Sequence, residues 1–467
     1  MLSQGAYIIE YPFISFTPNR INIGLEDSFI NENTSLFELV IWTSYKLVFE
    51  NVDCATNTST LQEHETLKEE VRRMLVGASK EHSEKLRLIE LLQRLGVSYH
   101  FENEIEDLLD GIAVACQDED DDLHIVALRS RLLRQHVRYQ FQKFKDSGGN
   151  FKESLDEDVE GMLSLYESTH LGIHGEDILD DAIAFTTAKL QLALPRIKSH
   201  HLAEHVRNSL NRPIRRCLPR LDTRNYITFY SADQSHDTTL LKFAKLDFNL
   251  LQRMHQKELS GLKEWWKSLN TTTDFPYARN RIVECYFWIM GVYFEPKYAL
   301  ARRVLTKILG MDTIVDDTYD AYGTSDELQL LTESYPEPPD TLPQTIKKAY
   351  SLVLNVYREI EEELEKVGRG FAVEYSKAAF QKAAAYQSIE AKWRDEGFVP
   401  SFEEYMEISK PTTFYPMLNV SSFIGMEKAT KEAMEWSSDP KMMDASSVIS
   451  RLMDDLVSLK VMQVVNV

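Results

Sequence analysis

The chain has 467 residues, enough for two or three domains with cores of their own. Lys and Arg number 52 and Asp and Glu 73, so the formal net charge of −21 argues against a protein that binds the nucleic-acid backbone. No long apolar run predicts a membrane span, and the N-terminus lacks the pattern of a signal peptide. The few cysteines are scattered, which is typical of an intracellular protein whose thiols stay reduced, so we expect a cytoplasmic protein.

The first 60 residues differ from the rest of the chain. They are rich in β-branched, aromatic, Asn, Thr and Ser residues and show no sustained helical stripe, so residues 1–60 are interpreted as an atypical N-terminal segment. Helical patterns begin at Leu61: apolar residues recur on one face of the segment 61–75, and the segment 83–96 starts with Ser and ends with Gly. Similar segments follow to the end of the chain, and no series of strands is evident. The predicted fold class is all-α.

An acid-rich motif, Asp316-Asp317-Thr-Tyr-Asp320, follows a segment with apolar residues every three or four positions. This spacing predicts a helix that ends at the acids, with Asp316 and Asp320 on one face. A helix C-terminus already carries partial negative charge, so the carboxylates need a cation. Mg²⁺ prefers oxygen ligands and often shares them with substrate phosphates. The alternative interpretation is a solvated acidic helix end.

A second cluster lies near the end of the chain. Arg451, Asp454 and Ser458 fall at positions i, i+3 and i+7, which share one face of a predicted helix. A carboxylate and a hydroxyl one turn apart form an oxygen-rich metal site, and an arginine one turn earlier suits a phosphate.

A third cluster, Arg279-Asn-Arg281, precedes an aromatic run that ends at Trp288. Arginines favour a phosphate, and aromatic faces favour an apolar or cationic group. The three clusters together predict a pocket with a metal, a phosphate and an apolar ligand.

Several long motifs in the same order resemble plant-type class I terpene synthases, most of all the sesquiterpene cyclases. The matching stretches are Pro276-Tyr-Ala-Arg-Asn-Arg-Ile-Val-Glu-Cys-Tyr-Phe-Trp288, Ile314-Val-Asp-Asp-Thr-Tyr-Asp-Ala-Tyr-Gly323, and residues 88–102 and 244–252. The resemblance extends from about residue 61 to about residue 460. It implies an N-terminal helical α-barrel domain at 61–225 and a C-terminal class I helical bundle at 226–467 that holds the active site.

The resemblance also implies an activity. The expected reaction is Mg²⁺-dependent ionisation of farnesyl diphosphate, with Mn²⁺ as an alternative metal, followed by cyclisation of the cation to a sesquiterpene. Geranyl diphosphate is the alternative substrate. Prenyl-chain elongation is a third possibility, but it requires a second full aspartate-rich motif that the sequence lacks. We expect a monomer that binds neither nucleic acid nor membranes.

Residue roles carry over from the matching motifs. The implied metal ligands are Asp316, Asp317, Asp320, Asp454 and Ser458. The implied catalytic residues are the diphosphate-contacting Arg279 and Arg451, Arg281 of the same Arg-x-Arg motif, and Trp288 of the pocket wall. The implied substrate-binding residues are Arg279, Asp316, Asp320, Arg451 and Asp454.

The sequence departs from the family at several places, of which the following bear on the site. Met462 stands where the second metal motif has Glu, and a thioether is a poor Mg²⁺ ligand. Asp312, one turn before Asp316, stands where the family has an apolar or small residue. The sequence stops at Val467, where the family continues for several helices. The alternative expectation is therefore a truncated, catalytically inactive member that at most binds Mg²⁺ and diphosphate.

Overall fold

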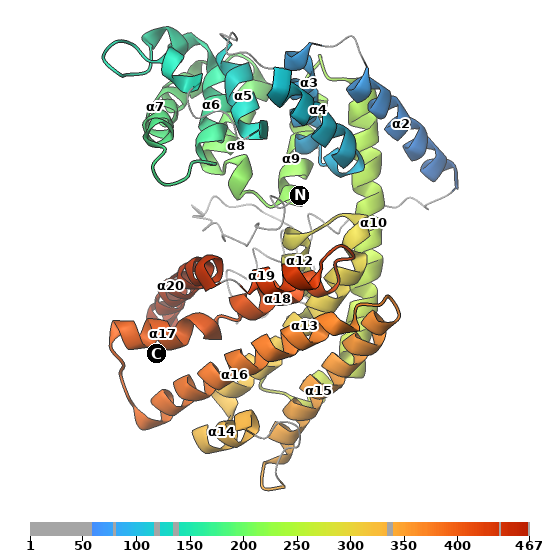
Figure 1. The fold of residues 1–467 in the computed structure, drawn as a ribbon, viewed down its shortest axis with the longest axis vertical. Coiled ribbons are helices and arrows are strands. Elements are labelled where there is room, and N and C mark those ends of the chain that lie inside the picture. The colour runs from blue at the N-terminus through green and yellow to red at the C-terminus, as the bar shows by residue number, and fades with distance from the viewer. Residues whose placement is uncertain are drawn as a thin grey trace. The chain divides into compact units, whose positions relative to one another are not determined.

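The computed structural model describes residues 58–77, 81–115, 122–133, 140–333, 340–438 and 440–465, without the side chains of residues 115, 140, 440 and 457–465. Within these ranges the regular structure is helical apart from one isolated β-bridge between Lys145 and Phe151 (Figure 1). The all-α prediction is confirmed. Of the segment interpreted as atypical, residues 1–57 lie outside the described residues. Residues 58–60 belong to helix α2, which starts at Thr58.

The described chain forms two compact units, divided between Arg253 and Met254 inside one long helix, α10 (Thr238–Ser268). The division predicted from the sequence, at 225/226, stays a prediction. The other α-helices of the N-terminal unit are α2 (Thr58–Val76), α3 (His82–Arg94), α4 (Glu102–Ala115), α5 (Leu123–Leu133), α6 (Val159–Thr169), α7 (Asp177–Ala193), α8 (His200–Asn211) and α9 (Pro219–Ala232). Its 3₁₀ turns are η1 (Ser98–His100), η2 (Gln140–Phe144), η3 (Glu153–Glu157), η4 (Leu194–Arg196) and η5 (Ile214–Arg216).

Helix α2 shows how the sequence pattern produces the N-terminal core. Leu67, Val71 and Leu75 recur every four residues and are buried. They join one apolar cluster with residues of α3, α9 and the first part of α10, among them Ile89 and Phe243. Burying this stripe is the main force that holds α2 against its neighbours.

The C-terminal unit contains the second part of α10 and ten further α-helices of the described chain. They are α11 (Thr271–Asp274), α12 (Ile282–Val292), α13 (Ala299–Asp317), α14 (Ser325–Glu333), α15 (Gln344–Glu365), α16 (Val373–Glu396), α17 (Phe402–Thr412), α18 (Tyr415–Ile424), α19 (Lys431–Ser437) and α20 (Pro440–Val465). Its shorter elements are the 3₁₀ turns η6 (Pro296–Tyr298) and η8 (Gly370–Ala372) and the π turn η7 (Thr318–Tyr322).

Helix α13 is the central element of this unit, and it packs against α12, α15 and α18 (Figure 1). Val304, Ile308 and Met311 lie on its buried stripe and are almost completely covered. The end of α18 comes so close that a Cβ on Gly425 would lie 2.4 Å from the Cα of Ala301, so only glycine permits this approach. This contact fixes the start of α13, at the end of the helix opposite the acids.

None of the helices in the described ranges combines the length and the apolar character needed to cross a lipid bilayer.

Candidate active site

The acid-rich motif lies where α13 ends and the π turn η7 follows. Asp316 is on the last turn of α13, and Asp320 is inside η7. Burial, together with the charges of Asp320, Asp317 and Asp454, raises the pKa of Asp316 to about 7, against the effect of Arg279. Burial likewise raises the pKa of Asp320. The carboxylates therefore lie close enough to repel one another, although the helix changes from α to π between them.

One arginine holds the turn that carries Asp320. The guanidinium of Arg394, on α16, donates from Nη1 to the backbone oxygens of Tyr319 at 2.6 Å and Asp320 at 2.9 Å, and from Nη2 to that of Gly323 at 3.0 Å. Carbonyl groups at a helix end have no partner within the helix, and a cation there also suits the helix dipole. Arg394 therefore fixes the backbone of η7 from a residue far away in the sequence.

Arg279 contacts the acids from the segment before α12. Its backbone N–H donates to Oδ2 of Asp317 at 2.7 Å, and its Nη2 lies 2.5 Å from Oδ1 of the same residue. The same Nη2 donates to Oδ2 of Asp316 at 3.2 Å. Tyr277, two residues earlier, hydrogen-bonds with Oγ1 of Thr318 at 2.8 Å and stacks on Tyr322 at 4.0 Å. This segment is thus attached to both sides of the acidic turn.

Asp316 also has a partner on α16. Nε2 of Gln387 donates to its Oδ1 at 3.0 Å. Both oxygens of Asp316 are therefore oriented, one by Arg279 and one by Gln387, while its side chain remains 31% exposed. Such orientation is what a metal ligand needs from its neighbours.

The second cluster lies on α20. Nε of Arg451 donates to Oδ1 of Asp455 at 2.9 Å, and its Nη2 pairs with Asp454. The hydroxyl of Tyr405, on α17, donates to Asp455 at 2.9 and 3.0 Å. Asp455 thus holds Arg451, whereas the Asp454 side chain remains 63% exposed.

The two clusters of the C-terminal unit are near enough for their charges to act on each other. The charge of Asp454 raises the pKa of Asp316, and that of Arg451 lowers the pKa of Asp320. The two clusters therefore interact electrostatically, and the predicted convergence of Asp316, Asp320, Asp454 and Arg451 into one metal and diphosphate site stays a prediction. The side chains of Ser458 and Met462 lie outside the described residues.

Arg281 and Trp288 have no such contacts with the acids in the described chain. Arg281 occupies the N-cap position of α12 without a capping side-chain hydrogen bond, and its Nε is buried without a hydrogen-bond partner among the described residues. Trp288, on α12, packs against the apolar cluster of Cys285 and Ile289, and its Nε1 likewise finds no partner there. Their predicted roles stay predictions.

Two features of this region escaped the sequence analysis. Glu390, on α16, has a pKa raised to about 7, mainly by burial and also by the charges of Asp320 and Asp455, while Thr412 and Arg451 oppose the shift. Phe414, between α17 and α18, is buried with φ at 58°, a left-handed conformation that is strained for a bulky residue. Neither feature has a motif: Glu390 is one of many helical acids, and a strained φ leaves no trace in the sequence.

Asp312 is a further buried carboxyl one turn before Asp316. Its side chain is almost fully covered, and its Oδ1 has no hydrogen-bond partner in the described chain. Burial raises its pKa well above the usual range, and the charge of Asp316 adds to the effect. Burial therefore favours the neutral form of the Asp312 carboxyl, which explains how α13 accommodates an acid at a buried position.

A cavity of about 250 Å³ lies beside the acidic turn, between α13, α15 and α16. Val315, Thr318 and Tyr319 line it, together with apolar residues of α15 and α16, whereas Asp316 and Asp320 do not. The cavity adjoins the acidic turn without including its carboxylates, so we do not assign it to the substrate.

The donor atoms of the site fit a hard divalent cation. Asp316, Asp320 and Asp454 could supply oxygen ligands, and a bound cation would favour the charged forms of Asp316 and Asp320, which burial disfavours. Arg279 and Arg451 supply guanidinium groups beside them. The fold and the site define an all-helical protein with an acidic cluster of the kind that suits a divalent cation.

Comparison with known proteins agrees with this definition. Residues 41–210 match the family model described as "Terpene synthase, N-terminal domain", and residues 267–466 match "Terpene synthase family, metal binding domain". A (−)-germacrene D synthase of Vitis vinifera is 48% identical over 435 residues, which cover 90% of this chain and 77% of the relative. A (+)-delta-cadinene synthase isozyme A of Gossypium arboreum is 47% identical over 432 residues, again 90% and 77% of the two chains.

Solved structures show the same relationship. The crystal structure of isoprene synthase from grey poplar leaves (Populus x canescens), in complex with three Mg²⁺ ions and dimethylallyl-S-thiolodiphosphate, superposes with a TM-score of 0.80 and 31% identity. The match covers 86% of this chain and 80% of that one. The chain belongs to the terpene synthase family, and the predicted family is confirmed.

Proposed function

We propose that the chain is a Mg²⁺-dependent sesquiterpene synthase that ionises farnesyl diphosphate and cyclises the resulting cation. The observation that carries the proposal is the electrostatic interaction of Asp316 with Asp320 and Asp454, together with the ion pair between Arg279 and Asp316. The relatives named as germacrene D and delta-cadinene synthases, at 48% and 47% identity, support the sesquiterpene class. The isoprene synthase complex with three Mg²⁺ ions supports the metal.

In the proposed reaction, the allylic C–O bond breaks and the diphosphate leaves with the electron pair. The carbocation then attacks a double bond of its own chain and ends as a cyclic hydrocarbon by loss of a proton. When bound, Mg²⁺ supplies positive charge for the leaving diphosphate, and Asp316, Asp320, Asp454 and Ser458 are the residues that would hold it. The side chains of the site have one of three roles: they bind the substrate, orient another side chain or exclude water.

The arginines bind the diphosphate. Arg279 is already oriented by Asp317, and Arg451 by Asp455, so both planar guanidinium groups are placed before the substrate arrives. The buried Nε of Arg281 lacks an acceptor among the described residues and can donate to an anionic ligand. We propose Asp317 and Gln387 as residues that position Arg279 and Asp316.

The cation requires an environment without nucleophiles. An aromatic ring stabilises positive charge through its face, and we assign this role to Trp288. Water must be excluded, because it would quench the cation. We assign the chemistry to the C-terminal domain and expect the chain to act as a cytoplasmic monomer.

Product analysis tests the proposal. The purified chain is incubated with Mg²⁺ and, in parallel, with farnesyl diphosphate, geranyl diphosphate, or farnesyl plus isopentenyl diphosphate. We expect cyclic C15 hydrocarbons from the first substrate at a higher rate than C10 products from the second, and no longer prenyl chains from the third. Folded protein that releases diphosphate from none of them would favour the inactive family member instead.

A further inference from the structure

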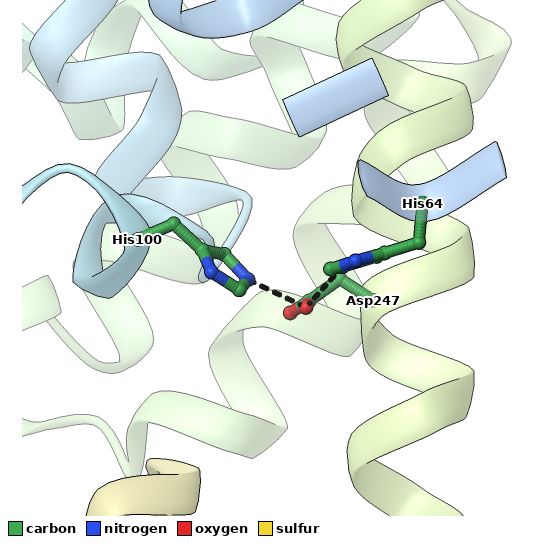
Figure 2. Close-up of side chains that lie close together, drawn as sticks. All are labelled: His64, His100 and Asp247. Carbon is green, nitrogen blue, oxygen red and sulfur yellow. Dashed lines mark hydrogen bonds and ion pairs between the residues drawn. The ribbon is translucent and has the colours of Figure 1, made fainter. Parts of the chain in front are cut away.

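Two imidazoles and a carboxylate meet in the N-terminal unit, on elements that are distant in the sequence (Figure 2). His64 is on α2, His100 ends the 3₁₀ turn η1, and Asp247 is on α10. Nε2 of His64 lies 2.9 Å and Nε2 of His100 lies 2.8 Å from the same atom, Oδ1 of Asp247. One ligand atom of each residue lies within 4.8 Å of the others. We call these three residues the His–Asp cluster.

The two carboxylate oxygens of Asp247 differ in their hydrogen bonding: Oδ1 has several partners, and Oδ2 has none among the described residues. The hydroxyl of Tyr99 also donates to Oδ1 of Asp247, at 2.8 Å, so three donors share one oxygen. The other oxygen, Oδ2, is buried without a hydrogen-bond partner among the described residues, and the side chain is only 3% exposed. A buried carboxylate oxygen that no donor satisfies is unfavourable, and a cation bound at this carboxylate would relieve it.

The surroundings keep both imidazoles in place. The ring of Phe243 lies 5.1 Å from His64 and 5.4 Å from His100, and it belongs to the apolar core of the unit. The two imidazole rings are 5.3 Å apart in an edge-to-face arrangement. Their side chains are 12% and 14% exposed, so the cluster is sheltered yet still reached by solvent. Preorganised ligands with a route to solvent are what a metal site requires.

We propose that the His–Asp cluster is a binding site for a divalent transition metal of the Zn²⁺ type. Two imidazole nitrogens and a carboxylate oxygen are ligands that Zn²⁺ accepts, whereas Mg²⁺ prefers oxygen alone. The site has three protein ligands, with water as the fourth, and Tyr99 orients the carboxylate. Each neutral imidazole binds the metal through Nε2 after its proton moves to Nδ1. The metal would link α2, η1 and α10 and would stabilise the N-terminal unit.

The first test uses the full chain, freed of metal by a chelator and titrated with Zn²⁺ alone in competition with a chromogenic chelator. We expect one site that binds more tightly than micromolar, and a thermal midpoint that rises with equimolar Zn²⁺ but not with the same concentration of Mg²⁺. A wild-type chain with no stoichiometric Zn²⁺ site overturns the proposal without any variant.

Variants then locate the site. His64→Gln, at the partly exposed edge of the cluster, and Asp247→Asn should each weaken Zn²⁺ binding at least tenfold. His174→Gln changes an exposed histidine of the same unit and should leave the affinity unchanged. The double variant Asp316→Asn and Asp320→Asn should also keep the Zn²⁺ site. Loss of Zn²⁺ binding in that double variant, with full binding in His64→Gln, would place the metal at the acidic turn and overturn the proposal. If Asp247→Asn does not fold, His64→Gln alone decides.

Discussion

Arg279 satisfies both carboxylate oxygens of Asp317, one through its backbone N–H at 2.7 Å and the other through its guanidinium at 2.5 Å. The Asp317 side chain is 10% exposed, against 31% for Asp316. Two adjacent aspartates of one motif therefore differ in their surroundings. Asp316 faces the other acids, whereas Asp317 attaches the Arg279 segment to the end of α13.

This difference predicts different phenotypes for Asp317→Asn and Asp316→Asn. Asp317→Asn weakens the hold on Arg279 and should lower kcat/KM for farnesyl diphosphate by about 10–100-fold, as expected for a residue that positions another. Asp316→Asn removes a proposed ligand and should lower kcat/KM further and raise the Mg²⁺ concentration for half-maximal rate. Both are measured by diphosphate release. Equal Mg²⁺ requirements for the two variants would argue against the distinction.

The contacts of Arg394 predict a second change in the Mg²⁺ requirement. Arg394→Gln removes the donors to the carbonyls of Tyr319, Asp320 and Gly323, so η7 should lose its fixed conformation. We expect the Mg²⁺ requirement to rise about tenfold or more, with a smaller effect on farnesyl diphosphate binding. Lys392→Gln, on the exposed face of the same helix, is the matched control. A normal Mg²⁺ requirement in folded Arg394→Gln would show that the turn needs no such support.

The buried Asp312 predicts a pH-dependent stability. Its pKa is raised in the folded chain, so above pH ~4 the unfolded chain has lost a proton that the folded chain retains. Raising the pH therefore costs stability, by up to about 1.4 kcal/mol per pH unit for one group. Asp312→Asn cannot ionise at this position and should gain stability relative to wild type as the pH rises from about 4 to about 7. Urea unfolding at both values measures the gap, and parallel pH profiles would contradict the prediction.

Glu90, in the N-terminal unit, predicts the opposite slope. Burial acts to raise its pKa, but Arg131 at 3.0 Å and Arg94 at 3.5 Å lower it to about 2. The stabilisation from this carboxylate is therefore fully present at pH 7 and decreases as the pH falls from about 5 towards 2. Glu90→Gln should cost about 3 kcal/mol at pH 7, as for a buried pair that loses one partner. In urea titrations this difference should shrink at acid pH. A difference independent of pH would exclude the ion pair as its cause.

Sequence reasoning predicted the elements of the site that are local. The apolar spacing before the acids predicted a helix, and α13 ends at Asp317 with Val304, Ile308 and Met311 buried. The i, i+3 spacing of Arg451 and Asp454 likewise predicted a shared helix face, and their side chains are paired. Such features depend on residues a few positions apart, where periodicity alone is informative.

The parts of the site that depend on packing were not predictable. Gln387, Glu390 and Arg394 reach the acidic turn only because α16 packs beside it, and no spacing in the sequence reports that contact. The change from α to π geometry after Asp317 also occurs beside tertiary contacts, namely those of Arg394 and the stacking of Tyr277 on Tyr322. The residue pattern placed Arg281 and Trp288 in the predicted pocket and the family resemblance gave them roles, but no contact in the described chain joins them to the acids.

The most direct test of the proposed metal-dependent chemistry is Mg²⁺-dependent release of diphosphate from farnesyl diphosphate by the purified full chain. Wild type and the double variant Asp316→Asn and Asp320→Asn are compared with Mg²⁺ and with a chelator. We predict release and a cyclic C15 hydrocarbon only from wild type with Mg²⁺, and at least a 100-fold slower release from the double variant, since each lost stabilising group typically costs ~10²-fold or more. Equal release from the double variant, or release that persists in the chelator, would contradict this chemistry.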